Sequence, residues 1–98
     1  MSWRQLGSPQ HEELRRLLVD RRQRAGLTQK EVAERLDRTQ RFISRVEAGS
    51  HRVTVVELIE FGLVLDFDPT AVLRQVMKRP ALELPLRARN PRRGKRGK

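Results

Sequence analysis

One face of a short segment that begins at Thr39 carries four polar side chains at helical spacing: Gln40, Arg41, Ser44 and Arg45. A glutamine amide can bond adenine through two hydrogen bonds, and an arginine guanidinium can do the same with guanine. A serine hydroxyl can bond a base or a carbonyl of its own helix. These residue types at this spacing predict a surface that reads base edges in double-stranded DNA. The alternative is a basic helix face that is only solvated.

The sequence lacks the groups of residues that catalysis or metal binding needs. The chain has no cysteine and two histidines, His11 and His51, which stand forty residues apart. A histidine without a second histidine or a cysteine nearby does not make a zinc site. The sequence shows neither a glycine-rich phosphate loop nor the paired carboxylates of a catalytic centre. We therefore expect a protein that is not an enzyme and that needs no metal or cofactor.

Two helix-start signals stand eleven residues apart, at Thr28 and Thr39. Thr28 followed by Glu31 predicts a capping box. In such a box the side chain of each residue accepts a hydrogen bond from the backbone N–H of the other. The segment "LTQKEVAERL" ends at a two-residue break, Asp37 and Arg38, before Thr39 opens "QRFISRVEA". Two helices joined by so short a turn cross at a large angle, as in a helix-turn-helix. The apolar side chains expected to fix this angle are Val32, Ala33, Leu36, Ile43 and Val46, with Phe42 partly buried beside them.

Three further helices complete a predicted all-α domain of five helices. The first, "HEELRRLLVDRRQRAG", has apolar residues at helical spacing. Thr54 and Glu57 form a second capping box before "VVELIEFGLVL", in which Gly62 costs about 1 kcal/mol relative to alanine and so indicates close helix–helix approach. Asp68 and Pro69 suit the start of the last helix. The expected inner faces are Leu14, Leu17, Leu18 and Ala25 on the first of these helices, Leu58, Phe61 and Leu65 on the second, and Val72, Leu73, Val76 and Met77 on the last.

The 98 residues are enough for one small core, and their composition divides the chain into three parts. We expect an N-terminal extension over 1–10, a helical domain over 11–79 and a basic, largely disordered tail over 80–98. The net charge is +10, and the tail holds seven basic residues against one acid. This excess favours a polyanionic partner. The tail is either an arm that adds sequence-independent affinity for DNA or a solubilising end without a function of its own.

The stretch "GLTQKEVAERLDRTQRFISRVEAGS" resembles the helix-turn-helix of the phage repressor and Cro type, the Xre family. The matching segments are "LTQKEVAERL", "TQRFISRVEAG" and "ELIEFGLVLDFDP", and the resemblance runs from about His11 to Lys78. It implies a five-helix, lambda-repressor-like DNA-binding domain whose recognition helix, Thr39–Ala48, lies in the major groove. Two positions depart from the family pattern: Asp37 stands where the turn commonly has glycine, and Gly62 stands where alanine is preferred.

The resemblance also implies roles for individual residues. The four polar residues of the recognition helix fall on positions that contact bases. Arg22 and Glu47 fall where many members have a partly buried ion pair between the first helix and the recognition helix. An unpaired acid on a DNA-facing helix would repel phosphate, which favours this pairing. The residues implied or expected to contact phosphate are Gln29, Thr28, Thr39, Ser50, His51 and Arg52.

We expect a sequence-specific repressor of transcription that binds an inverted repeat as a homodimer, since one such unit reads few bases. The last helix supplies either the dimer contact or only the closure of the monomer core. The alternatives are an antitoxin, which autoregulates through the same helix-turn-helix while it binds a toxin, and a non-specific nucleic-acid binder driven by the tail. The dimer contact would consist of Val72, Leu73, Val76 and Met77, with Leu82, Leu84 and Leu86 added.

The location follows from what the sequence lacks. Its first residues have no apolar core of the length that a signal peptide needs, and its most apolar run is too short to span a bilayer. We expect a cytoplasmic, nucleoid-associated protein of a bacterium or phage, without a membrane partner. No ligand domain follows the helical unit, so we do not expect it to sense small molecules.

Overall fold

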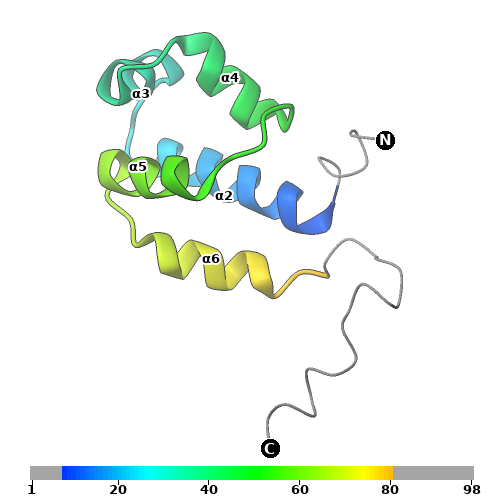
Figure 1. Cartoon of the computed structure of the whole chain (residues 1–98). Helices are drawn as coiled ribbons and strands as arrows, with labels where there is room; N and C mark the ends of the chain where they lie inside the picture. Colours follow the sequence, from blue (N-terminus) through cyan, green and yellow to red (C-terminus); the bar gives the residue numbers. More distant parts are fainter. Residues whose placement is uncertain (1–7, 81–98) are drawn as a thin grey trace, which may run out of the picture.

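The computed structural model describes residues 8–80, which form five α-helices joined by short connections (Figure 1). The helices are α2 (Pro9–Arg24), α3 (Gln29–Leu36), α4 (Gln40–Ala48), α5 (Val55–Leu65) and α6 (Pro69–Met77). These residues contain no strand, which confirms the predicted all-α fold. Figure 1 shows α3 and α4 at one end of the domain, α6 at the other, and α2 and α5 between them. Nearly all of the predicted tail, and most of the predicted N-terminal extension, lie outside the described residues.

Hydrogen bonds at the predicted caps determine where α3, α4 and α5 begin. In the first capping box, the Thr28 hydroxyl accepts from the backbone N–H of Glu31, whose carboxylate accepts from the backbone N–H of Thr28. Thr54 and Glu57 form the same pair of bonds before α5. The Thr39 hydroxyl accepts from a backbone N–H in the first turn of α4. Since such a cap contributes about 1 kcal/mol, the local sequence is enough to set these three boundaries.

The turn between α3 and α4 passes through a left-handed residue. Asp37 has φ 57° and ψ 43°, in the region that glycine adopts most easily. Aspartate tolerates this conformation better than most residues, because its short polar side chain can bond locally. The backbone therefore makes the tight turn without glycine, at some cost in strain. Gly49, with φ 84°, ends α4 as predicted.

The first helix differs from its prediction at both ends. It begins at Pro9 instead of His11, because the Ser8 hydroxyl caps it by accepting from the backbone N–H of His11. A proline fits this first position, where no backbone donor is required. At the other end the helix stops at Arg24, so Ala25 is its exposed C-cap and not part of the inner face. The prediction for Ala25 was therefore wrong.

A single core joins the five helices. α3 packs on α4 and α5, and α2 packs on α4, α5 and α6. α5 and α6 also pack on each other. Phe42 is 8% exposed, so it is buried and not partly buried as expected. Phe67, in the connection between α5 and α6, belongs to the core although the helical pattern did not include it. The buried apolar residues are Leu17, Leu18, Val32, Ala33, Phe42, Ile43, Val46, Phe61, Leu65, Phe67 and Val72.

Gly62 allows a close approach between α5 and the start of α6. A Cβ at this position would lie 2.8 Å from Cγ of Pro69 and 2.9 Å from the carbonyl oxygen of Phe67. Both distances are well below the contact distance between such atoms. The predicted close approach is therefore real, but the neighbour is the α5–α6 connection with the first residue of α6 and not the face of another helix.

The apolar residues of α6 divide between the core and the surface. Val72 is 1% exposed and Val76 is partly buried against the core. Leu73 and Met77 are 48% and 65% exposed. Val72 thus closes the monomer core and is not available to a second subunit, which corrects the expected dimer contact at this residue.

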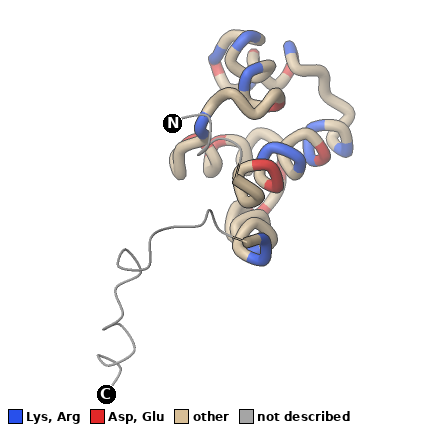
Figure 2. The backbone as a smooth tube through the Cα atoms, turned by 90° about the vertical axis from the view of Figure 1, so that its right-hand side faces the viewer, with Lys and Arg blue, Asp and Glu red and all other residues tan. Residues whose placement is uncertain are grey.

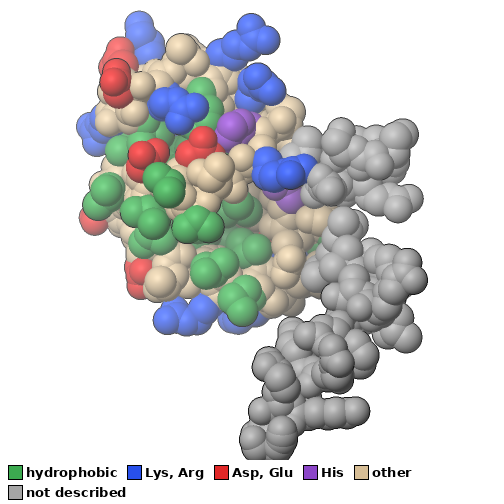
Figure 3. Space-filling view, viewed as in Figure 1, with side chains coloured by type: hydrophobic (Ala, Val, Ile, Leu, Met, Phe, Trp, Pro, Cys, Tyr) green, Lys and Arg blue, Asp and Glu red, His purple; other side chains and the backbone are tan. Residues whose placement is uncertain are grey.

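The surface of α5 is also apolar. Val55, Val56, Ile59 and Leu63 are 74%, 62%, 46% and 80% exposed. Figure 3 shows hydrophobic side chains gathered over α5 and α6 on the face turned to the viewer. We call the exposed residues of these two helices the apolar face; they are Val55, Val56, Ile59, Leu63, Leu73 and Met77. No helix in the described part of the chain is long and apolar enough to cross a membrane.

Candidate nucleic-acid interface

α4 divides its side chains between a buried face and a polar face. Ile43 and Val46 are 1% exposed and pack in the core. The four residues predicted to contact bases are all exposed: Gln40, Arg41, Ser44 and Arg45. An α-helix with its side chains is about as wide as the major groove of B-DNA, so this face is accessible to base edges.

Glu47 is on the same helix but its side chain is only 11% exposed, and it forms the predicted ion pair with Arg22 of α2. Nε of Arg22 donates to Oε2 of Glu47 at 2.6 Å, and Nη2 donates to Oε1 at 3.1 Å. A third donor, Nη1 of Arg22, bonds the carbonyl oxygen of Leu27 at 2.8 Å. The pair therefore ties together α2, the α2–α3 connection and α4, and it fixes the orientation of α4 on the domain.

Gln29, predicted to hold a phosphate, also takes part in this network. Its Nε2 donates to Oε1 of Glu47 at 2.8 Å, and the side chain is half-buried. One N–H of the Gln29 amide therefore bonds Glu47 inside the protein, and the other stays available to a phosphate. A backbone N–H in the first turn of α3 is available to a phosphate as well. A helix N-terminus attracts anions, so a phosphate contact at Gln29 would involve these remaining donors.

Two more of the predicted phosphate contacts, Thr28 and Thr39, are exposed N-cap residues. Each hydroxyl oxygen accepts a backbone N–H of its own helix. Because a hydroxyl is both acceptor and donor, each O–H can still donate to a phosphate oxygen. The cap role and the predicted contact are therefore compatible.

The loop after α4 contains the remaining three predicted phosphate contacts. Ser50 is exposed and its hydroxyl donates to the carbonyl oxygen of Arg45 at 3.3 Å. His51 is half-buried, with Nε2 3.0 Å from Oε1 of Glu57. A neutral imidazole that donates Nε2–H to Glu57 has only an acceptor at Nδ1, so His51 can donate to a phosphate only when it is protonated. Arg52 is exposed.

Two residues of α2 support the end of α4 and were missed by sequence reasoning. Nη1 of Arg15 donates to the carbonyl oxygen of Glu47 at 2.9 Å. Nε2 of His11 lies 3.3 Å from the carbonyl oxygen of Gly49. Cations and donors at a helix C-terminus stabilise its unpaired carbonyl groups. Since these partners are separated by 32 and 38 residues, no local pattern could have indicated them.

A second group of side chains surrounds Phe42 on the opposite side of α4 from Glu47. The guanidinium carbon of Arg38 lies 3.6 Å from the centre of the Phe42 ring, and the His51 ring meets it edge-on at 4.9 Å. Nη1 of Arg38 is 3.6 Å from Oε2 of Glu57. Burial alone would raise the pKa of the Glu57 carboxyl, but the Thr54 N–H, His51 and the charge of Arg38 outweigh it, so this pKa lies below its usual value.

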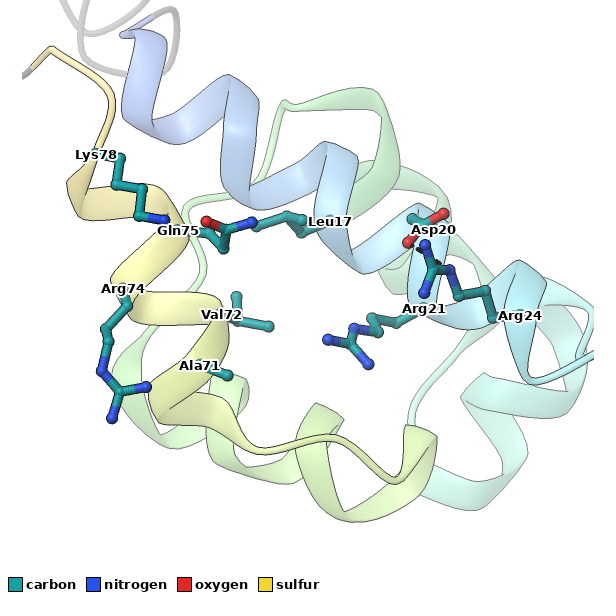
Figure 4. Close-up of a pocket in the computed structure, with 9 residues that line it drawn as sticks. All are labelled: Leu17, Asp20, Arg21, Arg24, Ala71, Val72, Arg74, Gln75 and Lys78. Atoms are coloured by element: carbon teal, nitrogen blue, oxygen red, sulfur yellow. Dashed lines mark ion pairs between the residues drawn. The ribbon is translucent and has the colours of Figure 1, made fainter.

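Positive charge is not confined to α4. Figure 2 shows Lys and Arg at the end formed by α3 and α4, and basic residues also lie on α2 and α6. A cavity of about 440 Å³ lies between α2 and α6. Figure 4 shows Arg21 directed into the space between these helices. Asp20 forms an ion pair with Arg24, in which Nε of Arg24 lies 2.9 Å from Oδ2 of Asp20. Among residues 8–80, no group of three or more His, Cys, Asp or Glu side chains could hold a metal ion.

Comparison with known proteins agrees with this geometry. A family model described as a helix-turn-helix domain matches residues 13–77. Among solved structures, an XRE-family like protein from Pseudomonas syringae pv. tomato str. DC3000 is similar at 38% sequence identity and a TM-score of 0.66, over 70% of this chain and 84% of that one. None of the curated proteins matches the chain. The chain therefore belongs to the Xre type of helix-turn-helix proteins, which are DNA-binding regulators of transcription.

Proposed function

We propose that this protein is a sequence-specific repressor that binds an inverted repeat as a homodimer, with α4 in the major groove of each half-site. The observation that carries the proposal is the division of α4. Four exposed polar side chains lie opposite a face that is buried and held by the Arg22–Glu47 pair. A rigid helix with outward donors can discriminate base edges because little backbone freedom is lost on binding.

The residues of the interface divide into two kinds. Gln40, Arg41, Ser44 and Arg45 read bases. Phosphates are bound at the start of α3, at the cap of α4 and in the loop after it, which positions α4 without reading the sequence. The residues that bind them are Thr28, Gln29, Thr39, Ser50, His51 and Arg52, together with backbone N–H groups at the start of α3. Such a protein acts in the cytoplasm on chromosomal or phage DNA.

Changes on α4 and at the start of α3 test this division. Gln40→Ala and Arg41→Ala should each relax specificity by about 1–3 kcal/mol at one base pair, while Gln29→Ala should weaken binding to all duplexes alike. The preferred duplex is first selected from a random pool, and affinities are then measured by fluorescence titration on matched and mismatched duplexes. Glu34→Ala, at an exposed position of α3 outside the proposed interface, is the control. Equal losses on every duplex for all three variants would contradict the assignment.

The apolar face supports the proposed homodimer. Removing a large apolar side chain from water contributes about 1.5–3 kcal/mol, and six such side chains are exposed here. A twofold dimer buries the same face on both subunits and can place the two copies of α4 about 34 Å apart, in successive major grooves. The proposed contact therefore consists of the exposed residues of α5 with Leu73 and Met77 of α6, and no longer includes Val72 and Val76. Leu82, Leu84 and Leu86 lie outside the described residues.

Sedimentation of the purified protein distinguishes the proposal from the antitoxin alternative. The repressor should sediment as a dimer by itself, whereas an antitoxin that needs this face for a toxin should be a monomer that forms a complex with another protein. The tail-driven alternative is tested by truncation at Pro80. The proposed repressor keeps its preference for the selected duplex, while a binder that depends on the tail loses nearly all affinity.

A further inference from the structure

We propose that Arg38 contacts a DNA phosphate, and that Glu57 at the start of α5 positions it. Arg38 is in the turn just before the cap of α4, and its side chain is 40% exposed. The inference rests on the proposed function, because it adds one phosphate contact beside the base-reading face of α4. It assigns to Arg38 and Glu57 a role in DNA binding that the sequence alone did not indicate.

The contacts of Arg38 hold its position while leaving its donors accessible. The guanidinium stacks on the Phe42 ring, with its central carbon 3.6 Å from the ring centre. Stacking uses the face of the guanidinium and leaves the five N–H donors along its edge. Within residues 8–80 these donors make no hydrogen bond to a protein acceptor, and the nearest carboxylate oxygen, Oε2 of Glu57, is 3.6 Å away. An arginine with this arrangement is already oriented for the planar, two-point contact that phosphate offers.

Glu57 is unusual because it is an acid placed beside a surface that should be positive. A carboxylate near DNA repels phosphate unless cations accompany it. The Glu57 side chain is 15% exposed, and two basic residues flank it: the Arg38 guanidinium at 3.6 Å and the His51 ring at 3.0 Å. Its oxygen Oε1 also accepts the backbone N–H of Thr54 at 2.9 Å, so the carboxylate is fixed by its own capping box.

This arrangement connects both ends of α4 to the first turn of α5. Arg38 precedes α4 and His51 follows it, and the Phe42 ring lies in contact with both. Phe42 in turn stacks on Phe61 of α5, with ring centres 6.3 Å apart. Glu57 therefore contacts two basic side chains, one from the connection before α4 and one from the connection after it. The other reading, a loose surface ion pair, would contribute almost nothing to DNA binding or to stability.

The capping boxes of this chain provide a matched control for Glu57. Glu31 is the equivalent residue of the Thr28 box, and it forms no ion pair with another of the described residues. Glutamine retains a capping box, so Glu57→Gln and Glu31→Gln each remove one negative charge and keep the helix start. A general electrostatic effect would be the same in both variants. A positioning effect would appear only at Glu57.

The first test measures binding of the full-length protein to one duplex at several salt concentrations. Arg38→Ala should weaken binding roughly five- to tenfold on matched and mismatched duplexes alike, and should reduce the slope of log K against log salt by about one. Arg74→Ala, which removes the same charge from an exposed position on α6, is the control and should change the slope less. An Arg38→Ala protein that is folded by circular dichroism and has an unchanged slope would refute the phosphate contact.

The second test asks whether Glu57 acts through Arg38. Glu57→Gln should weaken binding about threefold or more relative to Glu31→Gln, and it should have no further effect when Arg38 is already alanine. In proton NMR the ring current of Phe42 should shift the Arg38 side-chain signals upfield, and Glu57→Gln should move them back. Equal affinities of the two glutamine variants, or unchanged Arg38 signals, would overturn the positioning role. If instead the wild-type protein shows no sequence preference, the proposed function fails, and the salt slope of Arg38→Ala still tests the contact.

Discussion

Replacing Glu47 with alanine should destabilise the fold before it affects contacts with DNA. Glu47 accepts two hydrogen bonds from Arg22 and one from Gln29, at distances of 2.6, 3.1 and 2.8 Å. The substitution leaves the Arg22 guanidinium, which is 16% exposed, with the Leu27 carbonyl as its remaining hydrogen-bond acceptor among residues 8–80. Breaking a buried pair in this way costs about 3–5 kcal/mol, and the residual exposure favours the lower end, about 3 kcal/mol.

The size of this loss can be compared with the stability of the whole domain. A domain of this length has an unfolding free energy of roughly 4–11 kcal/mol. A loss of about 3 kcal/mol corresponds to a Tm lower by about 12–24 °C, since 1 kcal/mol shifts Tm by about 4–8 °C in a small domain. Most of the Glu47→Ala protein should therefore still be folded in the cold, and there it should keep much of its affinity for the selected duplex.

Thermal unfolding followed by circular dichroism checks the loss, and titration with DNA at low temperature checks the affinity. Glu34→Ala is the control, because Glu34 is exposed and forms no ion pair with another of the described residues. The double change Arg22→Met with Glu47→Leu should recover much of the stability, because apolar side chains of similar volume avoid the desolvation cost of the charges. A Glu47→Ala protein with Tm within about 2 °C of wild type that no longer binds DNA would show that Glu47 acts at the interface and not in the fold.

Three further changes test other parts of the structure. Gly62→Ala should lower the unfolding free energy by about 1–3 kcal/mol in denaturant titration, although alanine is the better helix former, because its Cβ would meet Pro69 and the Phe67 carbonyl. Glu57 has a folded-state pKa below its usual 4.5, so its contribution to stability is present above pH 4.5 and is lost as the pH falls through the folded-state pKa. Unfolding measured between pH 6 and pH 3 should therefore show a weaker loss for Glu57→Gln than for wild type. Leu63→Lys, at a position that is 80% exposed, should convert the proposed dimer to a monomer in sedimentation. It should also weaken binding to the inverted repeat without weakening binding to a single half-site. A dimer that persists in this variant would exclude this part of α5 from the contact.

Local signals were sufficient for the helices around the interface. Thr28, Thr39 and Thr54 begin their helices as predicted, because a cap depends on residues only three positions away. The start of α2 was predicted too late, since Ser8 is an equally good cap but lies outside the apolar repeat on which the prediction relied. The Arg22–Glu47 pair was implied by the family resemblance and is present in the structure. Its third member, Gln29, was instead expected to face phosphate.

Periodicity was less informative about which apolar faces are covered. The repeat on α6 groups Val72, Leu73, Val76 and Met77, but only Val72 and Val76 pack against the core. The repeat on α5 indicated an inner stripe and gave no sign that Ile59 and Leu63 would remain exposed on the other side. A helical repeat shows which side chains share a face, and it does not show how many neighbouring helices are available to cover it.

The sequence by itself determined the five helices, their caps, the tight turn at Asp37 and the set of polar side chains on α4, because each depends on residues within about one or two helical turns. Only the tertiary structure decided how α4 is held. The contacts of Glu47 with Arg22, of Gly49 with His11 and of Glu57 with Arg38 join residues from different helices or connections. Their geometry depends on the angles at which the helices pack, and these angles follow from the fit of side chains in the shared core.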